Sequence, residues 1–180
     1  MCSSDLESRL EKMNSLYSQY APKLEILKLA GDGEVFFSPA LRKTVQEAIL
    51  LPELRKLDVL TNGILFDSTA LEDLKPGSDR IRSVSVSIDA GDPETYRVVR
   101  NGNWNRLLQN LRWMSEMRRE RRFDFLGLAF VLRKANYRSL PAFLDLAEVL
   151  GVDEVYVSRL LPWDRMLIRF EEEAVSEFQH

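Results

Sequence analysis

The stretch that decides the fold is LEILKLAGDGEVFF, residues 24–37. A mostly apolar run, Leu24 to Ala30, leads into a turn that contains Gly31, Gly33 and Glu34. Ser38-Pro39 then begins a helix, because Ser caps helices and Pro suits their first turn. The order strand, turn, helix predicts a βα unit, in which ligands bind at the turn after the strand. Taken alone, the four residues 31–34 fit an ordinary turn better, so the rest of the chain has to decide.

The same unit repeats along the 180 residues. Periodicity predicts strands at 24–30, 56–60, 83–89, 125–132 and 154–161, and helices at 39–51, 68–74, 104–119 and 140–150. A short helical turn is expected at 92–96. This alternation predicts an α/β domain with right-handed crossovers and a parallel sheet. We expect one domain over 1–180, with a leading helix in 1–23, a βα core in 24–161 and a tail helix in 162–180.

The composition argues against several classes of partner and of functional site. A formal net charge of −3 gives no reason to expect nucleic acid or a membrane surface as a partner, and no apolar run has the length of a membrane span. No signal peptide is visible, and a cytoplasmic location is the expectation. The single cysteine, Cys2, rules out a disulfide within the chain. The single histidine, His180, argues against a His-based metal site or a Ser-His-Asp triad.

Polar residues gather where the predicted strands end. The first three strands finish at Gly31, Gly33 and Glu34, at Thr61-Asn62-Gly63, and at Ser87 and Asp89; Asn136 and Arg159 follow on the last two. Carboxyl ends of parallel strands open on one rim, so these residues are predicted to form a site for a polar, sugar-like or amino-acid-like ligand. The alternative is that each segment is only a turn.

Several of these segments resemble the motifs of radical S-adenosylmethionine (SAM) enzymes. Residues 29–39, LAGDGEVFFSP, resemble the family's GGEP segment, and LTNG at 60–63 resembles the TNG that ends its third strand. VSIDA at 86–90, followed by PETY at 93–96, resembles the family segment with the pattern vSiDg…petY. Segments 130–136 and 146–157 resemble the fifth and sixth strand units. The ordered match runs from about Leu24 to Leu161 and is most similar to the branch that carries SPASM or twitch domains.

The resemblance implies a partial (β/α)6 TIM-like barrel, here without its first strand. It also implies a [4Fe-4S] cluster held by three cysteines, which cleaves SAM to a 5′-deoxyadenosyl radical. By position, Gly33 and Glu34 would lie along the SAM methionyl amine, and Gly31 in the same turn is a further cofactor-binding candidate. Ser87 and Asp89 would face its ribose or carboxylate, and Leu160 and Leu161 its adenine, with Asn62 and Asn136 on the rim. Implied partners are a peptide, protein or small-molecule substrate and an electron donor such as a flavodoxin or ferredoxin.

The cluster motif is where the chain departs from the family. The pattern CxxxCxxC needs three cysteines, and the chain has one. Cys2 lies just before the predicted first helix, where the third cluster cysteine would be, and is the candidate metal ligand. One hypothesis is that the chain begins inside the motif; the alternative is a family member that has lost its cluster. Either way we expect no SAM cleavage by this polypeptide.

Two other functions remain open at this point. The same fold could serve as a non-catalytic module that binds a peptide or a partner enzyme. An unrelated α/β enzyme for a phosphorylated metabolite is the other alternative, against which the absence of a GxxxxGK[ST] phosphate loop argues.

Overall fold

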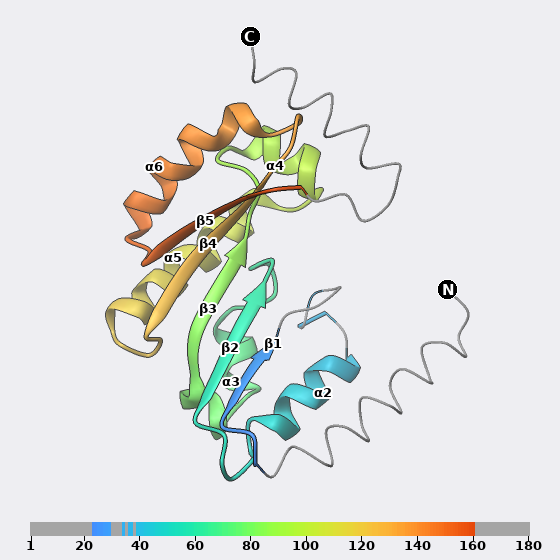
Figure 1. Cartoon of the computed structure of the whole chain (residues 1–180). Coiled ribbons are helices and arrows are strands. Elements are labelled where there is room, and N and C mark those ends of the chain that lie inside the picture. The colour runs from blue at the N-terminus through green and yellow to red at the C-terminus, as the bar shows by residue number, and fades with distance from the viewer. Residues whose placement is uncertain (1–22, 30–33, 35, 38, 161–180) are drawn as a thin grey trace, which may run out of the picture.

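A single parallel sheet forms the centre of the described structure. The computed structural model describes residues 23–29, 34, 36–37 and 39–160. Within them the sheet order is the chain order, β1 to β5 (Figure 1). The strands are β1 (Ile26–Leu29), β2 (Lys56–Thr61), β3 (Ile81–Ser87), β4 (Phe125–Leu132) and β5 (Glu154–Arg159), and every neighbouring pair is parallel. The predicted parallel α/β architecture is confirmed.

Helices connect each strand to the next. They are α2 (Pro39–Ala48), α3 (Ser68–Glu72), α4 (Pro93–Arg100), α5 (Trp104–Arg119) and α6 (Leu140–Leu150), with 3₁₀ turns at Gly77–Arg80 and Tyr137–Ser139. Three helices begin at a polar cap, because the side chains of Asp67, Asp92 and Asn103 accept from backbone N–H groups that have no partner inside the helix. Gly151 closes α6 in the left-handed conformation.

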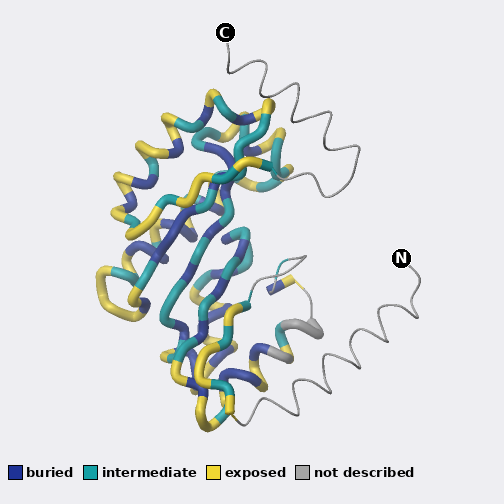
Figure 2. The backbone as a smooth tube through the Cα atoms, in the orientation of Figure 1, coloured by how far each residue is buried: buried dark blue, intermediate teal, exposed yellow. Residues whose placement is uncertain are grey.

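Among the described residues, helices cover one face of the sheet and not the other. On β3, Val84 and Val86 are fully buried, whereas the serines that alternate with them, Ser83, Ser85 and Ser87, are half-buried. The buried set packs against helix residues such as Leu107, Phe143 and Ala147 in one core. Figure 2 shows this burial concentrated in the central strands, with β1 and β5 exposed at the edges. The helices therefore lie against one face, and the small side chains line the other.

Element boundaries differ from the sequence-based expectation in a few places. The predicted helix 39–51 ends at Ala48, where Leu51 N–H bonds Ala48 C=O in a tighter turn before Pro52. The third strand lies at Ile81–Ser87, two residues before the predicted 83–89, because Asp89 has a left-handed φ of 59°. The fifth strand ends at Arg159, and the turn predicted at 92–96 is a helix of eight residues. The leading and tail helices lie outside the described residues.

Strand register brings the carboxyl ends together. Thr61 is opposite Val86, Ser87 is opposite Ala129, and Leu132 is opposite Arg159. The loops that follow β2, β3 and β4 therefore leave the sheet at neighbouring points of one rim, which is the condition for a shared site.

Candidate functional site

Glu34 is tied to the end of β2. Its carboxylate accepts from Thr61 Oγ1 at 2.7 Å and from the Asn62 backbone N–H at 2.6 Å. Thr61 Oγ1 in turn accepts from Gly63 N–H, and Asn62 Oδ1 accepts from Ile64 N–H. The Glu34 side chain thus fastens this residue to the end of β2, and the Asn62 side chain stabilises the loop that follows β2 from within. Gly31 and Gly33, predicted to join them, lie outside the described residues.

Asp89 is the buried centre of the next part of the rim. Its side chain is 0% exposed, and Oδ1 accepts from Val131 N–H at 2.7 Å. Oδ2 pairs with the Arg100 guanidinium at 2.7 Å and with that of Arg133 at 3.5 Å. The structure places this carboxylate among protein donors. Its direct contact with a ligand stays a prediction.

Arg100 and Arg133 were missed by the sequence reasoning. Arg100 is the last residue of α4 and donates to Ser87 Oγ as well as to Asp89. The Nε atoms of Arg100 and Arg133 are buried and have no hydrogen-bond partner among the described residues. Two guanidinium groups face one carboxylate, so the group of Ser87, Asp89, Arg100 and Arg133 carries a net positive charge. Such a group is suited to bind an anion such as a carboxylate.

Asn136 has a supporting position and not an open rim position. It is 1% exposed, and Nδ2 donates to the backbone C=O groups of Asp89 and Val131, both at 2.9 Å. Its Oδ1 accepts from Arg133 N–H at 2.7 Å. Asn136 therefore fixes the loop after β3 to the end of β4 and orients Arg133.

The start of α6 holds the same loop from the other side. Ser139 Oγ donates to Asp92 at 2.6 Å and accepts from Gly91 N–H at 2.6 Å. Burial raises the pKa of Asp92, but hydrogen bonds from Ser139 and Thr95 together outweigh it and hold the pKa below its usual value. Asp92 is thus an ionised helix cap, and the loop from Asp89 to Asp92 is rigidly positioned.

The remaining predicted residues divide between described and undescribed parts. Leu160 follows β5 and donates its N–H to Leu132 C=O at 3.3 Å. Leu161 and Cys2 lie outside the described residues. Within the described part no cysteine occurs, and no three His, Cys, Asp or Glu side chains come close enough to hold a metal ion. The described residues therefore do not fit a [4Fe-4S] cluster, which needs thiolates.

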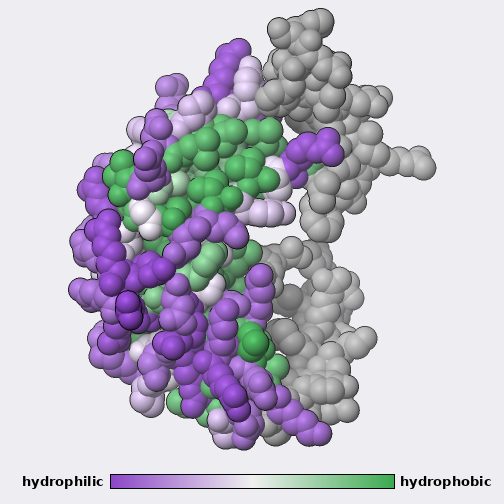
Figure 3. Space-filling model, turned by 60° about the vertical axis from the view of Figure 1, so that its left-hand side comes forward, coloured by the Kyte–Doolittle hydropathy of each residue, from purple (hydrophilic) through white to green (hydrophobic). Residues whose placement is uncertain are grey.

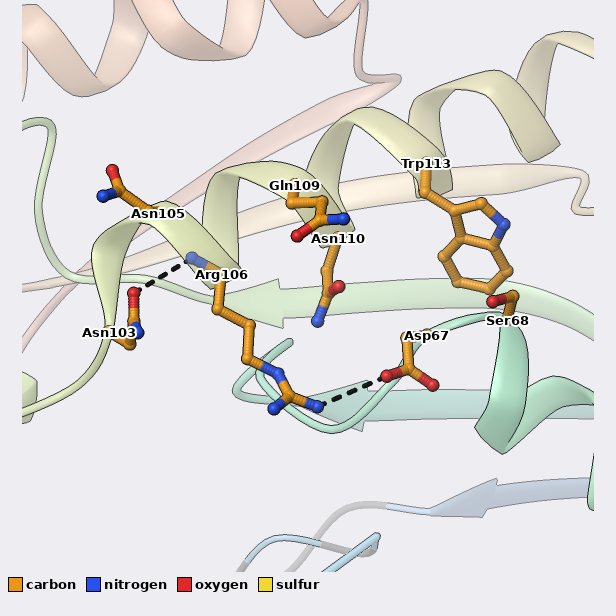
Figure 4. A pocket seen from close by; sticks show the side chains of 8 residues that line it. All are labelled: Asp67, Ser68, Asn103, Asn105, Arg106, Gln109, Asn110 and Trp113. Atoms are coloured by element: carbon orange, nitrogen blue, oxygen red, sulfur yellow. Dashed lines mark hydrogen bonds and ion pairs between the residues drawn. The ribbon is translucent and has the colours of Figure 1, made fainter.

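A second polar groove lies on the helical side, between α5 and the loop after β2. It has a volume of about 540 Å³ and is lined by Asp67, Arg106, Asn110 and Trp113, among others (Figure 4). Its side chains are largely engaged: Arg106 pairs with Asp67 at 3.4 Å, and Asn110 Nδ2 donates to the C=O groups of Gly63 and Ile64. The groove is best explained as the contact that holds this loop in place.

A comparison with protein-family models finds a match over most of the chain. The family model described as the radical SAM superfamily matches residues 22–147. No curated protein matches. In the described part of the chain, no helix has the length and apolar character needed to span a bilayer.

Solved structures share the fold. The SAM-bound structure of SuiB from Streptococcus suis has a TM-score of 0.60 at 12% identity, over 94% of this chain and 40% of that one. SuiB bound to its precursor peptide SuiA gives 0.57 at 13%, over 94% and 38%. TYW1 with a lysine-pyruvate adduct gives 0.56 at 18%, over 77% and 43%. At these identities the likeness shows the fold alone, which is a partial TIM-like barrel. The chain spans about two fifths of the length of these proteins.

Proposed function

The chain belongs to the radical SAM superfamily, and on that premise we propose that its partial barrel binds SAM at the carboxyl ends of β1 to β4. Membership implies SAM and a [4Fe-4S] cluster as cofactors. SAM is an amino acid joined to a nucleoside, so its site needs a group for the carboxylate, one for the ammonium and a surface for adenosine.

The observation that carries the proposal is the cationic group at the end of β3. Arg100 touches Ser87 and Asp89, Arg133 touches Asp89, and both guanidinium groups keep a buried N–H without a partner among the described residues. A carboxylate offers acceptors for such donors. In this proposal Arg100 and Ser87 bind the SAM carboxylate, and Asp89 positions Arg100.

The other contacts follow the family resemblance. Gly31, Gly33 and the backbone of Glu34 would receive the methionyl ammonium, and Asn62 would close that side of the site. The hydrogen bonds between Glu34 and the end of β2 support this placement, because they hold Glu34 at the rim. Leu160 and Leu161 would lie beside the adenine.

The proposal stops at binding. The chain has one cysteine, so its 180 residues do not supply the three thiolates of a cluster site. We therefore propose that this polypeptide binds SAM without cleaving it. When a cluster is bound, the chemistry it supplies to the family is an electron for SAM cleavage, from a donor such as a flavodoxin or ferredoxin.

A peptide is the substrate class that we favour for the domain. SuiB, which shares the fold, has been solved with a precursor peptide. A small-molecule substrate is the alternative. A neighbouring SPASM or twitch domain and a cytoplasmic location stay predictions from the sequence. The second candidate function is a non-catalytic peptide-binding module, which the single cysteine favours.

Calorimetry with two ligands tests the carboxylate contact. SAM should bind the intact chain. Arg100→Lys and Ser87→Ala should each lower the affinity for SAM about tenfold, because each removes one charge-assisted hydrogen bond, which contributes about 1.5 kcal/mol. Methylthioadenosine lacks the carboxylate, so its affinity should not change. Arg112→Ala, on the exposed side of α5, is the matched control.

Three results would contradict the proposal. Absence of SAM binding by the intact chain would refute it, and equal loss for SAM and methylthioadenosine would refute the carboxylate contact. Formation of 5′-deoxyadenosine after anaerobic reconstitution with iron and sulfide would refute the claim that the chain does not cleave SAM.

A further inference from the structure

The face of the sheet that no described helix covers holds a cavity, whose lining residues differ from those of the rim site. It has a volume of about 300 Å³, and its lining comes from every strand of the described sheet, β1 to β5. The floor is made of small residues on the two central strands: Ser83, Ser85, Gly127 and Ala129. Because larger side chains are missing here, the face is hollow between its two edges.

The two walls carry opposite charges. On one side, Lys28 of β1 is opposite Asp58 of β2 in the strand register. Lys56 also approaches Asp58, at 3.2 Å, so Lys28, Lys56 and Asp58 together give the described part of this wall a net positive charge. On the other side, Glu154 of β5 has no ion pair within the described residues and stands beside Tyr156, which is 60% exposed. The cavity is therefore positive at β1 and negative at β5.

The separation of the charges sets the length of the ligand. Lys28 and Glu154 lie on strands four spacings apart, about 19 Å along the sheet at about 4.8 Å per spacing. Sheet curvature and the side chains themselves shorten the gap. An extended chain advances about 3.3 Å per residue, so the Cα atoms of two residues separated by two to four positions lie about 7–13 Å apart, and their side chains extend further toward the walls. A free amino acid, whose charges flank one carbon, is too short to contact both walls.

We propose that this cavity selects a peptide segment carrying one acidic and one basic side chain separated by two to four positions. The acidic side chain pairs with Lys28, the basic side chain pairs with Glu154, and small residues between them lie on the Ser85–Gly127 floor. The inference rests on the proposed function in taking a peptide as the substrate. It adds the charge pattern that the substrate must have.

The test uses nuclear magnetic resonance titration of the isotope-labelled chain with short blocked peptides. Acetyl-Glu-Gly-Gly-Gly-Lys-amide should shift the Ser85 and Gly127 amides and bind at least about fivefold more tightly than acetyl-Gln-Gly-Gly-Gly-Gln-amide. Acetyl-Gly-Glu-Lys-Gly-Gly-amide, whose charges are adjacent, should bind no better than the neutral peptide. Equal affinities for the three peptides, or comparable shifts with free glycine, would overturn the proposal.

Charge reversal separates pairing from general electrostatics. Lys28→Glu and Glu154→Lys should each abolish the fivefold preference, and the double variant should restore it, because the peptide can bind in the opposite direction. Failure of the double variant to restore the preference would overturn the proposal. Both residues are exposed, so the fold should survive the changes.

SAM titration of the same variants keeps the two proposals distinct. SAM binding should be unchanged in all three variants, because neither residue lies at the rim. In the wild-type chain, absence of the charge preference with intact SAM binding would remove this inference alone. Absence of SAM binding with an intact charge preference would remove the proposed function alone.

Discussion

At the scale of single residues, Asp89 shows why a polar residue at a rim is not automatically a ligand contact. Its left-handed backbone turns the chain out of β3, and its carboxylate pairs with two arginines that come from α4 and from the end of β4. The charge of the site therefore depends on the balance of one buried acid against two bases. Removing the acid should change both stability and the ligand that the rim accepts.

Asp89→Asn isolates the charge, because Asn tolerates the left-handed conformation. We expect a loss of about 3 kcal/mol in the free energy of unfolding, since the variant leaves two guanidinium groups without their carboxylate. Urea denaturation measures it. Asp124→Asn, which breaks an exposed pair with Arg82, should cost less than about 1 kcal/mol. Equal losses in the two variants would contradict the structural role of Asp89.

At the scale of elements, the fold positions its loops by packing helix starts against strand ends. The first turn of α6 lies directly on the loop after β3, where Gly91 leaves no room for a side chain. A Cβ atom there would come within 2.2 Å of Phe143 N and 2.5 Å of the Ala142 carbonyl carbon. These are backbone atoms, so α6 itself would have to move.

Gly91→Ala should therefore destabilise the protein by about 3 kcal/mol or more, the upper range for overpacking. It should also weaken SAM binding, because Asp89 and Arg133 depend on the same loop. Gly151→Ala is the matched control: it has open space around it and a φ of 63°, so it should cost about 1 kcal/mol from backbone strain and leave SAM binding unchanged. Thermal unfolding and calorimetry measure both. A mild effect of Gly91→Ala on both readouts would show that α6 is not docked there.

At the scale of the whole molecule, the described sheet is open at both edges. Along β5, Tyr156 is 60% and Val157 is 42% exposed, and on α6 Val149 is 77% exposed. Figure 3 shows apolar side chains gathered on the upper half of one face. An exposed apolar edge strand is a template for pairing with another chain.

We therefore expect the 180-residue chain to associate as its concentration rises, through β5. Val157→Lys should raise the dissociation constant at least about tenfold, or about 1.4 kcal/mol. Sedimentation velocity over a concentration series measures it. Val98→Lys, on α4 and 60% exposed, should have no effect. A wild-type chain that stays monomeric throughout the series would contradict the expectation.

The sequence by itself determined the elements and their order. The bounds of α5, α6 and β4 coincide with those predicted, because caps, prolines and apolar periodicity are local signals. It also located the rim, since the carboxyl ends of parallel strands must meet. The fold class followed from these features, whereas the superfamily was indicated by the resemblance of the segments 29–39, 60–63 and 86–96 to its motifs.

Only the tertiary structure decided which rim residues are engaged in contacts with other parts of the protein. Arg100 lies on a helix and Arg133 beyond the next strand, and no local pattern links either to Asp89. Their pairing depends on how α4 folds back and on the register of β3 against β4. The same holds for the charged walls of the inner cavity, because Lys28 and Glu154 are far apart in sequence and become opposite walls only when five strands curve into one sheet.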